Sequence, residues 1–416
     1  MSPGDPPSTR HLALLLGGLA MFGPFSIDTI FPAFPQIGAH LGADKLAMQQ
    51  TISVYLLAYA AMSLVHGPLS DALGRKRVIL VGLAVFTLAS VGCALSTTLS
   101  ELLAFRALQG LSAGVGLIVG RAVIRDVLHG DDAQRLMSQV SMIFGIAPAV
   151  APVLGGWLLG WHRWPAIFLF LASFAALLAV AVWRGLPETH PPEARLPLRA
   201  GPLSRSYLGI ARNPRFLRLS AAAAMNFGAL FLYISSAPAF VLDLLTLDED
   251  QFGWFFIPMI SGMMLGAFAS GRAAGRIDGQ RMATWGFACC GIAMVLNVGY
   301  NLLASQPTLP WAVLPASLNA FGIALAFPII TLAILDMYPQ QRGSASSLQA
   351  FLGLLVNAVI AGSLSSMLSG SGLALAIGAS AFALIGWMFW WWETRGAPQP
   401  LRVPPSPTVL EPTDQM

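Results

Sequence analysis

The chain has 416 residues, of which 56% are hydrophobic and only 10% are charged, and its formal net charge at pH 7 is +4. Soluble domains carry roughly 25% charged residues, so this composition excludes an ordinary soluble protein and indicates an integral membrane protein. Three cysteines lie inside apolar runs without disulfide or metal-ligand spacing, so we expect no bound metal. The N-terminus lacks the basic region, short apolar core and cleavage site of a signal peptide, so we expect the first apolar run to stay in the bilayer.

A helix needs roughly 20 predominantly apolar residues to cross a bilayer. The chain contains about twelve such runs, near residues 11–35, 48–69, 78–98, 101–124, 136–160, 164–184, 216–240, 252–273, 282–303, 309–334, 344–368 and 372–393. These runs must be helical because lipid does not satisfy unpaired backbone groups. The sequence therefore predicts an all-α membrane protein with twelve transmembrane helices.

Basic residues gather in alternate breaks between the predicted spans, as is typical of the cytoplasmic side of a membrane protein. If the N-terminus is inside, the breaks facing outward hold only Lys45 and Arg163. The inner breaks hold Arg75, Lys76, Arg77, Arg125, Arg135, Arg272, Arg276, Arg281 and Arg342, besides those of the longest break. We predict that both termini are cytoplasmic and that the protein lies in the cell inner membrane. This orientation signal explains the positive charge, so we expect no nucleic-acid partner.

A long polar break, rich in proline and arginine, divides the spans into two sets of six. The predicted organisation is a cytoplasmic N-terminus at 1–10, a six-helix half at 11–184, a solvated cytoplasmic linker at 185–215, a second half at 216–393, and a cytoplasmic tail at 394–416. The tail is proline-rich and expected to be disordered. Two equal sets of six spans suggest a transporter built from two repeated halves, with its site at their interface.

The sequence GPLSDALGRKRVIL lies between the second and third predicted spans. Gly67 and Gly74 permit tight turning and close backbone approach, Asp71 can accept hydrogen bonds, and Arg75 to Arg77 form a cationic cluster. The spacing of Gly67, Asp71, Gly74 and Arg75 resembles the signature loop of the major facilitator superfamily. That resemblance implies a cytoplasmic gating motif in which Arg77 takes part.

Asp126, near the end of the fourth span, is a further candidate member of this gating motif. The family resemblance implies that Asp126 pairs with Arg75 and Asp71 in a charge relay that latches the cytoplasmic side when the protein opens outward. The alternative is routine charge at helix ends, and the residues alone do not decide between the two interpretations.

The fourth and fifth spans carry two further motifs. Arg106, followed by Gln109 and Gly110, resembles the R-x-x-Q-G element of drug:proton antiporters. The fifth span contains Pro148, Pro152, Gly155 and Gly156, which look like the proline–glycine antiporter motif. It departs from that motif at Ala147, where glycine often precedes the first proline. Over residues 10–395 the chain is similar to the bicyclomycin/chloramphenicol-resistance (Bcr/CflA-type) efflux subfamily. The alternative interpretation of both motifs is tight packing and bending.

Asp28 is the only acidic residue well inside the predicted membrane zone, and Arg106 is the deepest basic residue, at a broadly similar depth. Ionisable groups inside a membrane usually face the bundle interior and mark ion or proton paths. We predict that Asp28 carries the proton and that Arg106 is its partner; a structural pair between the first and fourth helices is the alternative. Pro24, Pro32 and Pro35 predict a bent helix around the carboxylate.

The predicted substrate cavity takes its apolar and aromatic lining, with a few polar groups, from the central helices of each half. Its candidates are Phe22, Phe25, Tyr55, Tyr59, Asn226 and Tyr233. One carboxylate with one arginine suits neutral or zwitterionic amphiphiles better than dications.

Together these features predict a proton-coupled multidrug or antibiotic efflux antiporter that works by alternating access as a functional monomer in the lipid bilayer. The proton gradient drives it, and we expect no cofactor because no G-x4-G-K-[ST] nucleotide motif is present. The first alternative is a proton-coupled importer of a sugar, nucleobase or peptide. The second is a membrane enzyme such as an acyl or lipid-modifying transferase, which needs a histidine or cysteine near a cavity, and we expect none of the six histidines to lie mid-span.

Overall fold

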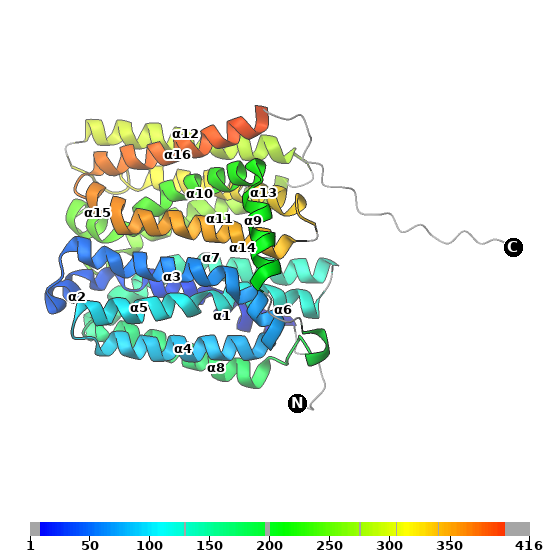
Figure 1. Cartoon of the computed structure of the whole chain (residues 1–416). Helices are drawn as coiled ribbons and strands as arrows, with labels where there is room; N and C mark the ends of the chain where they lie inside the picture. The colour runs from blue at the N-terminus through cyan, green and yellow to red at the C-terminus, as the bar shows by residue number, and fades with distance from the viewer. Residues whose placement is uncertain are drawn as a thin grey trace.

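The computed structural model describes residues 9–128, 130–195, 200–273, 276–304, 306–339 and 341–395, all of which form helices or short connections. In Figure 1 the helices of the first half lie below those of the second half, with nearly parallel axes. The predicted N-terminal segment 1–10 and tail 394–416 lie almost wholly outside the described residues.

The described part of the first half contains six spans, four of which are single unbroken helices. The first span is divided into α1 (Thr9–Asp28), the short η1 (Phe31–Ala33) and α2 (Phe34–Leu41). The others are α3 (Lys45–Leu73), α4 (Arg75–Leu95), α5 (Leu99–Gly114) continued by the π-helical turn η2 (Val115–Val119) and α6 (Gly120–Val127), α7 (Gly130–Trp161) and α8 (Pro165–Gly185).

The second half repeats this arrangement after a connecting segment. It contains α10 (Pro214–Ser235) with η4 (Ala239–Leu244), α11 (Gly253–Ala273), α12 (Gly279–Leu303), α13 (Leu314–Asp336), α14 (Arg342–Val359) with η5 (Ile360–Leu364) and α15 (Ser365–Leu368), and α16 (Gly372–Arg395). Among the described residues, eleven helices are long and apolar enough to cross a membrane, and the apolar part of α7, Ile146–Trp161, supplies the twelfth. The predicted all-α architecture of twelve membrane helices is confirmed.

The connecting segment, predicted to be a solvated linker, contains η3 (Pro192–Ala194) and the helix α9 (Ala200–Ala211), whose described side chains are mostly exposed or half-buried. Figure 1 shows α9 running across the axes of the other helices at the end of the bundle where α1 begins and α16 ends. We call this end of the bundle the linker end and the opposite end the far end. The Tyr207 hydroxyl donates to the Leu64 carbonyl of α3 at 2.8 Å. The Ser206 hydroxyl donates to Gln341 Oε1 at 3.0 Å, so α9 contacts both halves.

Glycines bring the helices of the first half into direct backbone contact. A Cβ atom on Gly110 of α5 would lie 2.2 Å from the carbonyl oxygen of Tyr55 in α3, and one on Gly116 would lie 2.0 Å from that of Leu19 in α1. Such distances are shorter than any side chain can occupy, so only glycine permits this packing of the fourth span. The two halves meet through α3 against α14 and α7 against α11.

Candidate functional site

The helix of the first span breaks directly after Asp28. Regular α-helix ends at this residue, and Thr29 and Ile30 form a turn before η1 begins. Pro32 lies in η1 and Pro35 lies at the start of α2, where their missing N–H groups remove two donors from the helical ladder. The predicted bend around the carboxylate is confirmed, and it takes the form of a complete interruption.

The Asp28 side chain is buried in the interior of the first half. Only 4% of the residue is exposed, and no hydrogen bond or ion pair joins its carboxyl group to another residue within the part of the chain that the structure describes. An ionised carboxylate in an apolar interior is costly unless it is paired. Asp28 is therefore a position where a proton or a bound molecule would supply a missing partner.

Arg106 is the other ionisable residue of this region, and it is fully buried. Its Nε atom donates to the carbonyl of Thr51 at 3.2 Å. Its Nη1 atom donates to the carbonyl of Ser26 at 3.0 Å and to Oε1 of Gln109 at 2.7 Å. The guanidinium lies over the ring of Tyr55 at 4.4 Å from its centre, in a cation–π contact. Arg106 thus ties α5 to both α1 and α3.

The expected direct pair between Asp28 and Arg106 is wrong in this structure. Arg106 binds the backbone carbonyl of Ser26, two residues before the carboxylate, and its Nη2 atom has no hydrogen-bond partner among the described residues. Tyr55 interacts electrostatically with both the acid and the base. The first half therefore holds an unpaired buried acid and a partly unpaired buried base around one tyrosine.

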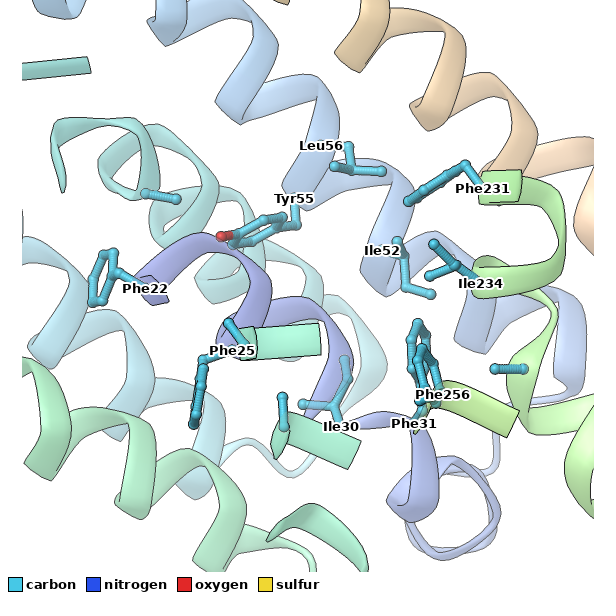
Figure 2. Packing of buried hydrophobic residues seen from close by; sticks show 14 of the residues in the cluster. Phe22, Phe25, Ile30, Phe31, Ile52, Tyr55, Leu56, Phe231, Ile234 and Phe256 are labelled. Carbon is cyan, nitrogen blue, oxygen red and sulfur yellow. The ribbon is translucent and has the colours of Figure 1, made fainter. Parts of the chain in front are cut away.

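Two of the residues predicted to line the cavity, Phe22 and Phe25, lie elsewhere. The ring of Phe22 packs against Phe86 of α4 with 3.9 Å between centroids, and Phe25 stacks on Phe174 of α8 at 5.6 Å. Figure 2 shows both rings on the side of α1 that faces away from the second half. Assigning them to the cavity is wrong, because this face of α1 packs against α4 and α8 inside its own half.

The prediction that Asn226 and Tyr233 line the substrate cavity is likewise wrong. Both are buried in α10, seven residues apart and so on the same helix face. The Tyr233 hydroxyl accepts a hydrogen bond from Nδ2 of Asn297 in α12 at 2.8 Å, so this face looks into the second half. Of the predicted lining residues, Tyr55 and Tyr59 are the two that lie beside the Arg106 region, in T-shaped contact at 6.4 Å.

The interface between the halves is formed by residues that sequence reasoning missed. Phe31, from the break in the first span, stacks on Phe256 of α11 with 6.2 Å between centroids. Figure 2 shows Ile52 of α3 opposite Phe231 and Ile234 of α10. These residues carry no signal that separates them from their neighbours, because the positions beside them in each helix are mostly apolar as well.

The far end is closed by polar contacts between the halves, most of which come from α3. Lys45 Nζ pairs with Asp243 Oδ2 at 2.5 Å. Three side chains of α3 also donate to backbone carbonyls of the second half, Gln49 to Ser235 at 3.0 Å, Gln50 to Gly362 at 2.8 Å and Ser53 to Ala358 at 2.9 Å. A further contact joins Nε2 of Gln36 to Oε2 of Glu249 at 3.3 Å, and burial in this loop raises the pKa of Glu249 above its ordinary value.

The glycines of the fifth span lie against the helix break and the second half. A Cβ atom on Gly155 would lie 2.1 Å from the carbonyl oxygen of Thr29, the residue after Asp28. One on Gly156 would lie 2.3 Å from the carbonyl oxygen of Glu249. Pro148 and Pro152 lie inside the same helix, α7. This motif therefore joins the buried acid to the contact between the halves.

At the linker end the predicted charge cluster is present around Arg75. Its Nη1 atom pairs with Asp71 at 2.5 Å, and its Nε atom pairs with Asp126 at 3.0 Å. Its backbone N–H donates to Oε1 of Glu188 at 2.9 Å, and the Thr189 hydroxyl donates to Asp126 at 3.0 Å. The predicted pairing is confirmed, and the cluster also includes the first residues of the connecting segment.

Three other residues of the signature loop, Gly67, Gly74 and Arg77, differ in how closely they pack against the rest of the protein. Gly74 has φ +98° between α3 and α4, and a Cβ atom there would lie 2.6 Å from Oε2 of Glu188. Gly67 has nothing within 4 Å of such an atom, so the expected close approach at this position is wrong. Arg77 is exposed and lies outside the cluster.

The sequence model of the Major Facilitator Superfamily matches residues 14–361. The chain belongs to the major facilitator superfamily. A relative in Haemophilus influenzae, the bicyclomycin resistance protein homolog, is 28% identical over 369 residues, 86% of this chain and 90% of the relative. The uncharacterized MFS-type transporter YdgK of Bacillus subtilis is 31% identical over 355 residues, 84% of this chain and 87% of the relative.

A solved superfamily structure shares the fold. It is a bacterial homologue of the human lysosomal transporter Spinster, which aligns with a TM-score of 0.69 and 17% identity over 94% of this chain and 98% of its own. The predicted membership of the superfamily and the resemblance to its bicyclomycin-resistance branch are confirmed. The chain is a multi-pass membrane transporter, which excludes the interpretation as an acyl or lipid-modifying transferase.

Proposed function

We propose that this transporter is a proton-coupled antiporter that exports small drug-like molecules across the cell inner membrane by alternating access. The observation that carries the proposal is the Asp28 carboxyl group. It is 4% exposed, unpartnered among the described residues, and located at a helix break that packs against the proline–glycine motif of α7. Intramembrane acids in such positions mark ion or proton paths.

In the proposed cycle, a proton from outside binds Asp28, favours release of the drug and allows return to the inward-open form. Arg106 holds α1 and α3 in place around the carboxyl group, and its unpaired Nη2 atom is a donor available to substrate. One acid and one base favour neutral or zwitterionic amphiphiles, such as the bicyclomycin named for the Haemophilus relative. A strong preference for dicationic dyes in a transport assay would contradict this substrate class.

The proposal also sets the orientation. The linker end is the cytoplasmic end, because the basic residues gather in the connections at this end. The protein works as a monomer in the lipid bilayer, with the proton gradient in place of any cofactor.

The test compares Asp28→Asn with the wild type in inside-out membrane vesicles carrying an imposed pH gradient. We expect the variant to bind bicyclomycin nearly as well as the wild type, because asparagine keeps the shape of the side chain. Uphill transport should fall to background because the amide cannot bind and release a proton. The matched control is Asp248→Asn, an exposed acid at the far end, which should transport normally. Normal pumping by Asp28→Asn would overturn the proposal.

Whole cells give the direction of transport. In an exporting cell, a protonophore should increase the retained drug, whereas it would abolish uptake by an importer. The second result would replace the export proposal with import of a metabolite.

A further inference from the structure

His66 is a buried titratable residue that the proposed cycle does not use. It lies towards the linker end of α3 with only 2% of its surface exposed. The Nδ1 atom has no partner among the described residues. Buried polar atoms are rarely left unpaired, and each exception requires an explanation.

The unpaired nitrogen points at an irregular part of the fourth span. A Cβ atom on Gly114 would lie 2.8 Å from Nδ1 of His66 and 2.9 Å from Cε2 of Tyr59, so both rings contact this glycine. The π-helical turn η2 begins at the next residue, Val115. Single π-helical turns within α-helices are frequent at functional sites. The histidine therefore lies where the backbone of the neighbouring helix is itself irregular.

His66 also lies between the two polar regions of the first half. Tyr55, Tyr59, His66 and Ser70 are spaced by four, seven and four residues, so they follow one face of α3. At one end of this row Tyr55 lies under the Arg106 guanidinium. At the other end, the Ser70 hydroxyl accepts a hydrogen bond from Arg75.

We propose that His66 is a second proton-binding group, through which the proton of Asp28 passes to the linker end. This inference rests on the proposed antiport. The O–H bond of the Asp28 carboxyl group breaks and leaves a carboxylate, and the Nδ1 lone pair of neutral His66 gains a proton. Eleven residues of α3, about 16 Å of helix, separate Tyr55 from His66, so this transfer passes through water along the row that Tyr55 and Tyr59 form. The imidazolium then gives this proton to water at the linker end. No electrons are exchanged with any other group.

Two other titratable groups face this step. Tyr59 shares the contact with Gly114, and Arg121 of α6 interacts electrostatically with Tyr59. The charge of Arg121 opposes a long-lived imidazolium, so it favours onward release of the proton over its retention.

The test uses the full-length protein in inside-out membrane vesicles, whose medium contacts the linker end. Bicyclomycin uptake is measured while the medium is varied from about pH 4 to about pH 8, a range that includes the ordinary pKa of histidine, at a constant pH difference across the membrane. In the wild type, uptake should slow as the medium becomes more acidic, because the imidazolium can no longer release its proton.

His66→Gln should bind bicyclomycin like the wild type, transport about tenfold more slowly or worse, and lose this dependence on the pH of the medium. His66→Asn is the second variant, and His162→Gln, an exposed histidine, is the matched control. A merely structural role would change the rate or the thermal stability without flattening the pH profile.

Two results would overturn the inference. One is a wild-type profile of uptake against pH that shows no step in this range. This measurement does not depend on the folding of any variant. The other is a variant that keeps the wild-type rate and profile. Both leave the antiport proposal standing as long as the wild type accumulates bicyclomycin with the gradient. Failure of the wild type to accumulate any drug would instead count against the proposed function itself.

Discussion

Arg106 shows how one buried side chain can organise several helices. Arginine carries five N–H donors in a rigid planar fork and accepts no hydrogen bonds. In this transporter the fork reaches backbone carbonyls of α1 and α3 and the amide of Gln109. Gln109 in turn donates to the Ser90 hydroxyl of α4 at 2.7 Å. Four helices thus meet around one cation that leaves Asp28 without a direct partner.

Arg106→Lys is expected to disrupt this arrangement despite keeping the charge. Lysine offers a point charge without the planar fork, so it cannot reach all three acceptors at once. Each lost hydrogen bond from a charged group costs about 1.5–3 kcal/mol. We expect thermal unfolding in detergent at a lower temperature and gradient-driven export reduced at least about tenfold. Arg281→Lys, at an exposed arginine, is the control. Unchanged stability and export would show that charge alone matters at position 106.

For single residues, the sequence predicted which charged side chains lie inside the membrane. Asp28 and Arg106 are recognisable because a charge in an apolar run is costly wherever the run packs. Their relation to each other was not predictable. It depends on whether the guanidinium reaches the carbonyl of Ser26 or the carboxylate two residues later, which is a matter of helix rotation.

The first and fifth spans form one functional element. The carbonyl of Thr29, which belongs to the break after Asp28, lies where a side chain on Gly155 of α7 would have to be. The proline–glycine motif therefore sets how closely α7 approaches the buried acid. Its packing role and its proposed role in antiport are two consequences of the same contact.

Gly155→Ala tests this contact. The added methyl group would lie 2.1 Å from the Thr29 carbonyl oxygen, so α7 or the helix break must move. Overpacking of this kind costs about 1–3 kcal/mol, which should lower the unfolding temperature and slow export. Gly160→Ala in the same helix meets nothing within 4 Å and should be neutral or stabilising by up to about 1 kcal/mol. Equal effects of the two substitutions in a thermal unfolding assay would refute a special role for Gly155.

As a whole, the molecule is joined tightly at its far end and crossed by α9 at its linker end. The far-end contacts include one exposed ion pair, Lys45 with Asp243, and exposed pairs contribute little, typically below about 1 kcal/mol. The buried donors of α3 that bind carbonyls of the second half hold this end closed. Alternating access requires these contacts to break and form again in every cycle.

A disulfide across this interface should stop transport. A Cβ atom on Gly362 would lie 2.9 Å from the Cβ of Ser53, close enough for Ser53→Cys with Gly362→Cys to form a disulfide after a small adjustment. The substitutions are made in a transport-competent background without Cys93, Cys289 and Cys290. Oxidation should abolish bicyclomycin export, and reduction should restore it, whereas neither single-cysteine variant should respond. Full export by the oxidised double variant would mean that the far end does not open there.

The sequence by itself determined the twelve spans and the bend in the first helix, and the family resemblance implied the pairing of Asp71, Arg75 and Asp126. Apolar length, proline and charge spacing act locally, so their effects survive any rotation of the helices. Only the tertiary structure decided which face of each helix meets which neighbour. Phe22 and Tyr233 turned inward to their own halves, Phe31 and Phe231 formed the interface, and His66 was buried against Gly114. The physical reason is that a helix in lipid is apolar on every side, so hydrophobic periodicity no longer marks the direction of the core.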